Sequence, residues 1–541
     1  MTMRPFTCAL SVFLLGLGCV LLPGQEPERH IPRNVIVIVV DDLNDSIAGF
    51  GGHPQAKTPH LDRLRQRATT FTNAHCNAPI CGPSRASMWT GLHPISTGYY
   101  GYQQQRNHWR QFPALAHAPT LMERLRDHGM QVGGTGKVFH NGHEDNSVWS
   151  TEGVISGSGY PSDFGPWPWD GTTIRWGRRH GVGHPRMPGE FAGFRWDGFG
   201  PLSDIPQVPA TDESPGYTGW VLGDGAFHWR SNEDRDLMPD ELNAQWAAQR
   251  LQHEHDTPFF MVVGMNRPHA PRYAPDEYFD LFPLDEVQLP AYKEDDLKDV
   301  PTILWQNEDG SRQWQAQWLP RLLAAGGEEW WRRSVRSYLA CVAFVDAQIG
   351  VVLDALEDSP HAANTLVIIV SDHGFHLGEK DHLKKTTIWE EVTRIPMIIS
   401  GPGVSAGASV SHPVSLIDIY PTVLDLLHIP TNEYDATLDG HSLRPFLEDA
   451  DATWDGPSVA LSVLHGPHHV EPHQPAPIED QHHSIRDQRY RYTLCSDGSE
   501  ELYDLKNDPH SWHNQADNPA YAREKERLRQ TLYHLVFADH P

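Results

Sequence analysis

The chain has 541 residues, of which 39% are hydrophobic and 21% are charged, and its formal net charge at pH 7 is −27. This composition is typical of a large globular protein with a sizeable core, and it argues against disorder. The negative charge argues against nucleic acid as a partner, because such binding depends on basic patches that neutralise phosphates. An anionic substrate would likewise need a local positive pocket.

The first 24 residues resemble an export signal. Arg4 precedes an apolar run that reaches Leu22, where a Pro-Gly pair ends it. The run is too short to favour a membrane span, and a buried N-terminal helix is the less favoured interpretation. Cys19 is a poor lipidation site because the apolar run continues beyond it. We expect an exported protein, periplasmic or secreted, with no stable membrane span in the mature chain.

Four later segments share one layout, an apolar run of strand length that ends in polar or ionisable residues. They are residues 34–43, 130–140, 258–269 and 364–374. Such runs fit strands that are buried on both faces of a parallel sheet. Helix-like stretches alternate with them, at residues 58–68, 118–129, 239–252 and 337–358. The alternation predicts an α/β fold with a large, mostly parallel sheet, which brings all four polar endings to one rim.

The segment from Asn141 to Arg235 is rich in Gly, Pro and Trp and has no clear periodicity. It predicts long surface loops, which in a compact domain usually carry function. Its tryptophans could form walls on which sugars stack, or could equally attach the loops to the core. These tryptophans are Trp149, Trp167, Trp169, Trp176, Trp196, Trp220 and Trp229.

The pattern changes after Pro430. We divide the mature chain into an α/β domain at 25–440 and a smaller subdomain at 441–541, with its sheet in the part that begins at Asp455. Residues 482–505 predict two antiparallel strands around an Asp-Gly turn, and residues 522–537 predict a terminal helix. The subdomain should therefore be a small antiparallel sheet with a helix packed on it.

Two of the predicted strands end in carboxylates, at Asp41 with Asp42 and at Asp372. Three carboxylates directed at one place require a cation, and an oxygen-rich set selects Ca²⁺ or Mg²⁺, with His373 as a further ligand. Either acidic site alone could be a turn or a helix cap. The placement of both at strand ends favours a metal site.

Cys81 stands at the start of a predicted helix, in the sequence Cys81-Gly-Pro-Ser-Arg85. A soft sulfur ligand matches a hard cation poorly, whereas an oxygen at this position would match it. The pentapeptide has the C-x-P-x-R form of the type I sulfatases, and the chain resembles that family over nearly its whole mature length. The blocks that carry the resemblance, in family order, are VIVIVVDDL, TPHLDRL, GLHP, GKVFH, NRPHAPRYAP, SDHGFHLGEK and ELYDLKNDP. GKVFH and RPHAP look most like iduronate-2-sulfatases and their bacterial relatives.

The resemblance implies an alkaline-phosphatase-like fold and a maturation enzyme that converts Cys81 to formylglycine. Of the two hydroxyls of the hydrated aldehyde, one would bind the metal and attack sulfur. The other would be deprotonated, so that sulfate is eliminated and the aldehyde regenerates. One Ca²⁺ would be held by Asp41, Asp42, Asp372, His373 and the modified Cys81.

The resemblance also implies roles for the remaining site residues. Arg85 would position the formylglycine, while Lys137 and Lys385 would contact the sulfate. His140 would act on the hydrate, and His269 would lie beside the bridging oxygen. Lys385 is preferred to the adjacent Lys384 from the register of the block. These roles agree with the charge neutralisation and leaving-group protonation that the reaction needs.

The leading interpretation is a Ca²⁺-dependent sulfatase that acts on a sulfated carbohydrate. The subfamily resemblance implies the 2-O-sulfate of a terminal uronic acid. Sulfated algal oligosaccharides, phosphoester or phosphonate ester substrates, and a catalytically silent glycan-binding module are the alternatives. Lone histidines such as His228 and His376 are expected to be structural.

Four cysteines lie outside the signal, at Cys76, Cys81, Cys341 and Cys495. They could make two disulfides, but they do not form the framework of a disulfide scaffold. If Cys81 is modified, at least one of the other three must stay unpaired.

Overall fold

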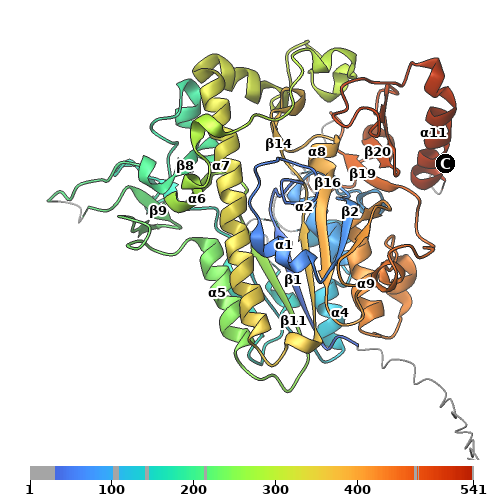
Figure 1. Ribbon diagram of the computed structural model, residues 1–541, viewed down its shortest axis with the longest axis horizontal. Coiled ribbons are helices and arrows are strands. Elements are labelled where there is room, and N and C mark those ends of the chain that lie inside the picture. Colours follow the sequence, from blue (N-terminus) through green and yellow to red (C-terminus); the bar gives the residue numbers. More distant parts are fainter. Residues whose placement is uncertain are drawn as a thin grey trace, which may run out of the picture.

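The computed structural model describes residues 31–101, 109–140, 145–212, 216–467, 472 and 474–538. In these residues a large sheet lies between helices, and a smaller sheet with its own helix lies at one side (Figure 1). The predicted signal peptide and Cys19 lie outside the described residues.

Nine strands form the large sheet of the described chain, in the order β17-β2-β16-β13-β1-β11-β3-β4, with β18 also paired to β2. The strands are β1 (Asn34–Val40), β2 (Thr69–His75), β3 (Gln131–Gly136), β4 (Gly157–Pro161), β11 (Phe259–Met265), β13 (Thr365–Ser371), β16 (Arg394–Ser400), β17 (Ala408–Val410) and β18 (Val414–Ser415). The four predicted strands are the neighbours β13, β1, β11 and β3, and they pair in parallel. Only β16 runs antiparallel to its neighbours, so the prediction of a mostly parallel sheet is confirmed.

Successive side chains of β1 point alternately into two cores. Ile36 and Ile38 belong to one apolar cluster and Val35 and Val37 to another, because successive strand residues point to opposite faces. The first core is covered by α1 (Pro59–Arg65), α5 (Pro239–Leu251) and α7 (Trp318–Glu357). The second is covered by α2 (Cys81–Thr90), α4 (Leu121–Asp127) and α9 (Ile419–Leu426). Burial on both faces explains why the strand sequences are continuously apolar.

Helix α7 is much longer than the 337–358 segment predicted from the sequence. Gly327 has φ 70°, which interrupts the helical backbone between its two parts. The stretch Gln315–Glu357 is the one helix of the described residues that is long and apolar enough to cross a membrane, but 78% of its most apolar window is buried in the structure. That burial is also found in the core helix of a soluble protein.

The segment predicted as loops contains short strands instead of one long irregular stretch. They are β5 (Trp167–Pro168), β6 (Ile174–Arg175), β7 (Arg178–Arg179), β8 (Phe199–Pro201), β9 (Trp220–Leu222) and β10 (Gly225–Phe227). β5, β9 and β10 form a small sheet, and β8 pairs with β12 (Arg272–Ala274). Most of the predicted tryptophans are buried or partly buried, whereas Trp176 is 89% exposed. Trp220 and Trp149 attach these segments to the two cores, whereas Trp167 and Trp169 form a small cluster of their own with Phe164 and Val221.

The smaller sheet consists of β19 (Ala460–Leu464), β20 (His482–Arg486), β21 (Tyr490–Leu494) and β22 (Glu500–Asp504), all antiparallel. Helix α11 (Ala522–Phe537) packs on β20 and β21. The predicted sheet and helix are confirmed, but residues 482–505 form three strands and not two. The extra strand comes from a tight turn after Arg486 that the sequence pattern does not predict, where Asp487 accepts backbone hydrogen bonds from Arg489 and Tyr490.

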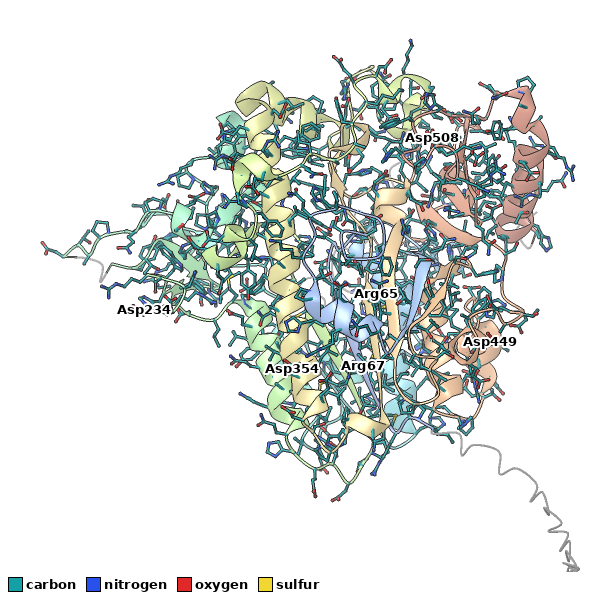
Figure 2. The ribbon with its side chains drawn as sticks, in the orientation of Figure 1. Arg65, Arg67, Asp234, Asp354, Asp449 and Asp508 are labelled. Carbon is teal, nitrogen blue, oxygen red and sulfur yellow. The ribbon has the colours of Figure 1, made fainter. Side chains whose placement is uncertain are left out.

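Short elements complete the described chain. They are α3 (Pro94–Thr97), α6 (Asp276–Asp280), α8 (Glu390–Thr393), α10 (Arg444–Glu448), β14 (His376–Leu377) and β15 (Leu383–Lys384). Leu443, Phe446 and Leu447, around α10, pack in the core that α9 covers. The residues just after 441 therefore pack against the large sheet. Four acidic side chains, Asp234, Asp354, Asp449 and Asp508, lie at widely separated places (Figure 2).

Candidate active site

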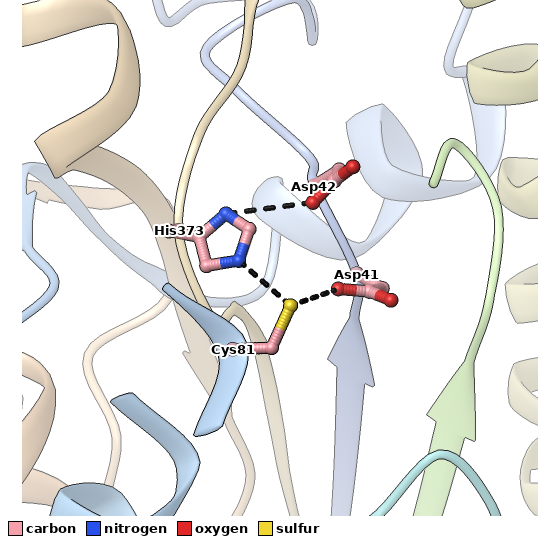
Figure 3. A group of neighbouring side chains, drawn as sticks. All are labelled: Asp41, Asp42, Cys81 and His373. Carbon is pink, nitrogen blue, oxygen red and sulfur yellow. Dashed lines mark hydrogen bonds and ion pairs between the residues drawn. The ribbon is translucent and has the colours of Figure 1, made fainter. Parts of the chain in front are cut away.

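Cys81 is the first residue of α2 and is fully buried beside the carboxyl end of β1. Its Sγ atom lies 3.5 Å from Oδ1 of Asp41 and 3.1 Å from Nε2 of His373 (Figure 3). Asp41 directly follows β1, and His373 lies two residues beyond β13. Asp42 takes a left-handed conformation with φ 65°, which Asp tolerates better than most residues. The parallel pairing of β1 and β13 therefore brings these side chains together.

Asp41, Asp42, Cys81 and His373 form a group that could hold a metal ion. Their ligand atoms lie within 4.8 Å of one another, and all four residues are buried. The carboxylates suit a hard divalent cation, whereas the sulfur does not. The donor set would fit such a cation better if position 81 offered oxygen in place of sulfur.

Asp372, also predicted as a ligand, borders this group. Its Oδ2 accepts a 2.8 Å hydrogen bond from Nε of Arg85 and lies 3.7 Å from Nε2 of His373. Its Oδ1 accepts from the backbone N–H groups of Asp42 and His373, at 3.3 and 3.1 Å. The carboxylate thus ties β13 to β1 at the site.

Three cations surround the three carboxylates. The guanidinium of Arg85 reaches Asp372 and lies 3.8 Å from Oδ1 of Asp41, and Lys137 forms an ion pair with Asp41. Nζ of Lys385 lies 2.7 Å from Oδ1 of Asp42 and 3.0 Å from Sγ of Cys81. The charges balance without a metal, so a bound divalent cation would make the site positive. Together with such an ion, this arrangement would supply the local positive pocket that an anionic substrate needs.

Burial and neighbouring charges shift the ionisation of these groups. Burial raises the pKa of Asp41, but Lys137, Lys385 and Arg85 together outweigh burial and hold that pKa below its usual range. Burial raises the pKa of Asp42 to about 7, an effect that Lys385 partly offsets. Burial, with Lys385 and Lys137, holds the pKa of His269 well below its usual value, so that its ring is neutral.

The adjacent lysines Lys384 and Lys385 point to different places. Lys384 forms an ion pair with Asp197, and its Nζ lies 4.0 Å from the centre of the Trp318 ring. Lys385 faces Cys81. The amine beside Cys81 is therefore that of Lys385, the lysine that the register of the sequence block favours.

A cavity of about 410 Å³ opens beside the group. The site residues Asp42, His140, His269 and Lys385 line it. Nδ1 of His269 is 2.5 Å from the carbonyl oxygen of Ala270, and its ring packs at 4.4 Å from that of Phe164. Arg85 and Lys137 are fully buried and do not line the cavity.

Several residues of the cavity wall are not among those predicted from the sequence. These are Ala270, Trp314, Gln315, Trp318, Phe375, Lys384 and Thr386, which join Trp196 from the predicted tryptophans. Trp314 is 48% exposed and Trp196 is 38% exposed. Trp314, Gln315 and Trp318 could have been predicted from the segment QWQAQW, where tryptophans occur just before a long apolar helix.

Residues outside the cavity wall have structural contacts. His228 lies 2.9 Å from Asp234 at the surface, and Nε2 of His376 lies 2.7 Å from Oγ1 of Thr387 in the interior. Cys76, Cys341 and Cys495 are buried, and no disulfide joins them.

The sequence is similar to those of known proteins. A family model described as Sulfatase matches residues 33–429, and one described as N-sulphoglucosamine sulphohydrolase, C-terminal, matches residues 378–537. A "Sulfatase" of Formosa agariphila is 33% identical over 527 residues, which cover 96% of this chain and 90% of that protein. An "Iduronate 2-sulfatase" of Mus musculus is 25% identical, with 77% and 73% covered. An "Ulvan-active sulfatase" of Formosa agariphila is 24% identical, with 98% and 86% covered.

Solved structures share the fold. A 2-O GAG sulfatase is 20% identical with a TM-score of 0.59, and 93% of this chain and 91% of that chain are covered. A phosphonate monoester hydrolase from Silicibacter pomeroyi is 23% identical with a TM-score of 0.64, with 93% and 94% covered. The matched family pattern spans most of the chain. The protein therefore belongs to the sulfatase family, has its alkaline-phosphatase-like fold and is a sulfuric ester hydrolase.

Proposed function

We propose that the protein is an exported sulfatase that hydrolyses a sulfate ester of a sugar, with a formylglycine derived from Cys81 as its nucleophile and one Ca²⁺ at the site. The observation that carries this proposal is the position of the Cys81 side chain. Its Sγ lies within 3.5 Å of Asp41, His373 and Lys385 at once. A nucleophile at that position would face both the carboxylates that attract a cation and an amine that attracts an anion.

The chemistry at position 81 supports its oxidation to an aldehyde. The surrounding carboxylates favour a hard cation, for which a thiolate is a poor ligand. The hydrated aldehyde would supply one hydroxyl as nucleophile and a second whose deprotonation expels sulfate. Cys81 and Arg85 have no exposed surface in the folded chain. The maturation enzyme would therefore have to act before the segment is buried.

The other residues would bind the sulfate and handle protons. A Ca²⁺ ion, when bound, would neutralise negative charge on the nucleophile and the sulfate. Lys137 and Lys385 would stabilise the charge that develops on the transferring group. Burial, together with the repulsion of a proton by the two lysines, keeps the pKa of His269 low and its ring neutral; a bound sulfate would offset the repulsion. The imidazolium so formed would protonate the sugar oxygen as its bond to sulfur breaks.

The wall of the cavity supports a sugar as the leaving group. The exposed rings of Trp196 and Trp314 line it, and such rings bury the apolar faces of sugars well. Relatives act on GAG 2-O-sulfate, iduronate 2-sulfate and ulvan by their names. We propose the 2-O-sulfate of a terminal uronic acid as substrate, with sulfated algal oligosaccharides as the alternative.

A phosphonate or phosphate ester is a second candidate. A phosphonate monoester hydrolase shares the fold, and a tetrahedral anion of either element could approach Lys385, which lines the cavity. The C-x-P-x-R sequence at Cys81 favours sulfate.

The test is release of free sulfate by protein produced with a maturation enzyme, after mass spectrometry has shown formylglycine at position 81. The substrates are 2-O-sulfated uronide-terminated disaccharides, hexosamine-sulfated oligosaccharides and sulfated algal oligosaccharides. Release from the uronide set alone is expected, and Cys81→Ala should abolish it. Release only from other sugars would retain the chemistry and replace the substrate. Release from none would direct attention to phosphate and phosphonate esters.

Export has its own test. Expression of the full chain should yield a mature form in the periplasm or medium that begins after residue 24. Retention of the intact N-terminus in the cytoplasm would contradict export.

A further inference from the structure

The segment from Gly378 to Thr386 carries Lys385 and has an unusual backbone. Gly378, Lys380, Asp381, Lys384 and Thr386 all have positive φ, at 141°, 51°, 62°, 91° and 71°. Residues with a side chain rarely adopt such angles, and a β-branched residue such as Thr almost never does. Left-handed residues of this kind persist only where surrounding contacts hold them.

One anchor is Lys380, which is 1% exposed. Its Nζ donates to the carbonyl oxygen of Ser511 at 2.7 Å and lies 3.4 Å from Oδ2 of Asp296. The same amine lies 5.0 Å from the ring centre of Tyr503, on β22, and 5.5 Å from that of Trp389. This contact ties the segment to the C-terminal sheet.

A second anchor is Asp381, which is 6% exposed. Its Oδ2 accepts from Nη1 of Arg312 at 2.7 Å, and its Oδ1 accepts from the hydroxyl of Tyr292 at 2.8 Å. Both partners come from the connection that precedes α7. The carboxylate therefore holds the turn against a different part of the chain from Lys380.

After these anchors the segment returns to the site. β15 pairs with β14 in antiparallel register, with His376 opposite Lys384. The N–H group of Thr386 donates to the carbonyl oxygen of Pro79 at 3.3 Å, two residues before Cys81. Lys385 lies between these fixed points, so its direction depends on the turn at Lys380 and Asp381.

We propose that Lys380 and Asp381 are positioning residues that hold the turn in its left-handed conformation and thereby keep the amine of Lys385 at position 81. The proposal rests on the proposed role of Lys385 in binding sulfate. Without the anchors, the turn relaxes toward ordinary backbone angles and the amine moves away from the site. Neither anchor contacts the sulfate itself.

The test is a double-mutant cycle on the Ca²⁺-loaded protein, with inorganic sulfate as the probe and its dissociation constant as the readout. Lys385→Ala should weaken sulfate binding roughly 10- to 100-fold, because a charged hydrogen-bond donor is lost. Asp381→Ala should weaken it about tenfold, but should add little in the Lys385→Ala background, because both changes remove the same contact. Lys380→Met should behave as Asp381→Ala does.

Matched variants separate positioning from general loss of structure. Asp381→Asn adopts the left-handed conformation readily and can still accept from Tyr292, but it loses the ion pair with Arg312, so it should weaken sulfate binding less than Asp381→Ala does. Lys293→Met removes the other lysine near Asp296, outside the segment, and should leave sulfate binding unchanged. Thermal unfolding of every variant checks that it is folded.

The outcomes distinguish two failures. Additive effects of Asp381→Ala and Lys385→Ala, or a loss in Asp381→Asn as large as in Asp381→Ala, would overturn the positioning role alone. If Lys385→Ala leaves sulfate binding unchanged, the proposed role of Lys385 fails and the positioning inference fails with it. If all folded anchor variants bind sulfate as the parent does, the anchors have no such function.

Discussion

Arg85 serves two buried carboxylates at once. Its guanidinium hydrogen-bonds Asp372, lies close to Asp41 and also donates to the backbone of Lys137, all without exposed surface. Burial of charges costs free energy that only their pairing offsets, so removal of one partner is more damaging than the absence of the whole pair. A single side chain thus joins α2, β1, β13 and the residues after β3.

We predict that Arg85→Leu lowers the free energy of unfolding by about 3–5 kcal/mol, because Asp372 and Asp41 stay buried beside an apolar side chain. Urea unfolding at pH 7 measures the change. Arg65→Leu, at the end of α1, is the comparison, since that arginine is partly exposed. Equal stability of the parent and Arg85→Leu proteins would contradict the proposed balance of charges.

At the scale of elements, the N-terminal end of α7 brings tryptophans to the cavity. Trp314 precedes the helix and Trp318 begins it, with ring centres 4.8 Å apart and nearly perpendicular rings. Trp318 is almost fully buried under Lys384, whereas Trp314 is about half exposed. The exposed ring is therefore the one that is available to a substrate.

We predict that Trp314→Ala raises KM for a sulfated disaccharide roughly tenfold, the equivalent of about 1.4 kcal/mol of lost stacking and burial, with a smaller change in kcat. Steady-state kinetics with disaccharide and monosaccharide sulfates measures the effect, which should be smaller for the shorter substrate. Trp176→Ala, on the exposed β6–β7 hairpin, should leave both constants as they are. A KM unaffected by Trp314→Ala would remove this ring from the sugar site.

Strand β20 gives the C-terminal sheet a dependence on pH. Burial lowers the pKa of His482 to about 4 and that of His483 to about 3. Both rings are neutral in the folded chain and become protonated near pH 6.5 when unfolded. Their contribution is fully present above pH 6.5 and is lost as the pH falls toward 4 and 3.

We predict that each histidine costs about 2 kcal/mol of stability at pH 5 relative to pH 8. Replacement of His483 by Phe, beside Phe537, should remove its share of the loss. Denaturant unfolding between pH 5 and 8 measures the slope, with exposed His513→Gln as the control. An unchanged slope in His483→Phe would show that this ring is not the source.

At the scale of the whole molecule, a strongly acidic protein brings three cations together at one largely buried site, although its formal net charge is −27. The three cations at the site balance three carboxylates, so a bound divalent ion would give the site an excess of positive charge. The net negative charge of the chain repels anions that lack a specific site.

We predict that Ca²⁺ raises the unfolding temperature in a saturable way, by the equivalent of about 2.7 kcal/mol at a hundredfold excess over its dissociation constant, and that a chelator reverses it. Thermal unfolding measures this without any assay of activity. Asp41→Asn should abolish the saturable part and leave only weak, non-saturating binding to the acidic surface. A parent protein indifferent to Ca²⁺ and chelator would argue against the metal at this site.

Much of the fold and the family could be predicted from local patterns. The apolar runs of β1, β3, β11 and β13 predict buried parallel strands, because a strand that is buried on both faces is apolar at consecutive positions. The blocks around Cys81, Lys137, His269 and Asp372 each lie at a strand end or a helix start, where the chain order already points to one rim. The turn after Arg486 could not be predicted from the local sequence, because Asp-Gln-Arg lacks the Gly that marks most hairpin turns.

The amino-acid sequence by itself determined the α/β class, the family and the set of residues that meet at the site, because each is written in contiguous segments with their own periodicity or spacing. Only the tertiary structure decided that Lys384 pairs with Asp197, that Asp372 is tied to Arg85, and that Trp196 and Trp314 share one cavity. Those facts depend on contacts between distant segments and on left-handed backbone angles that no local pattern specifies. Packing, which acts between segments, is what fixes them.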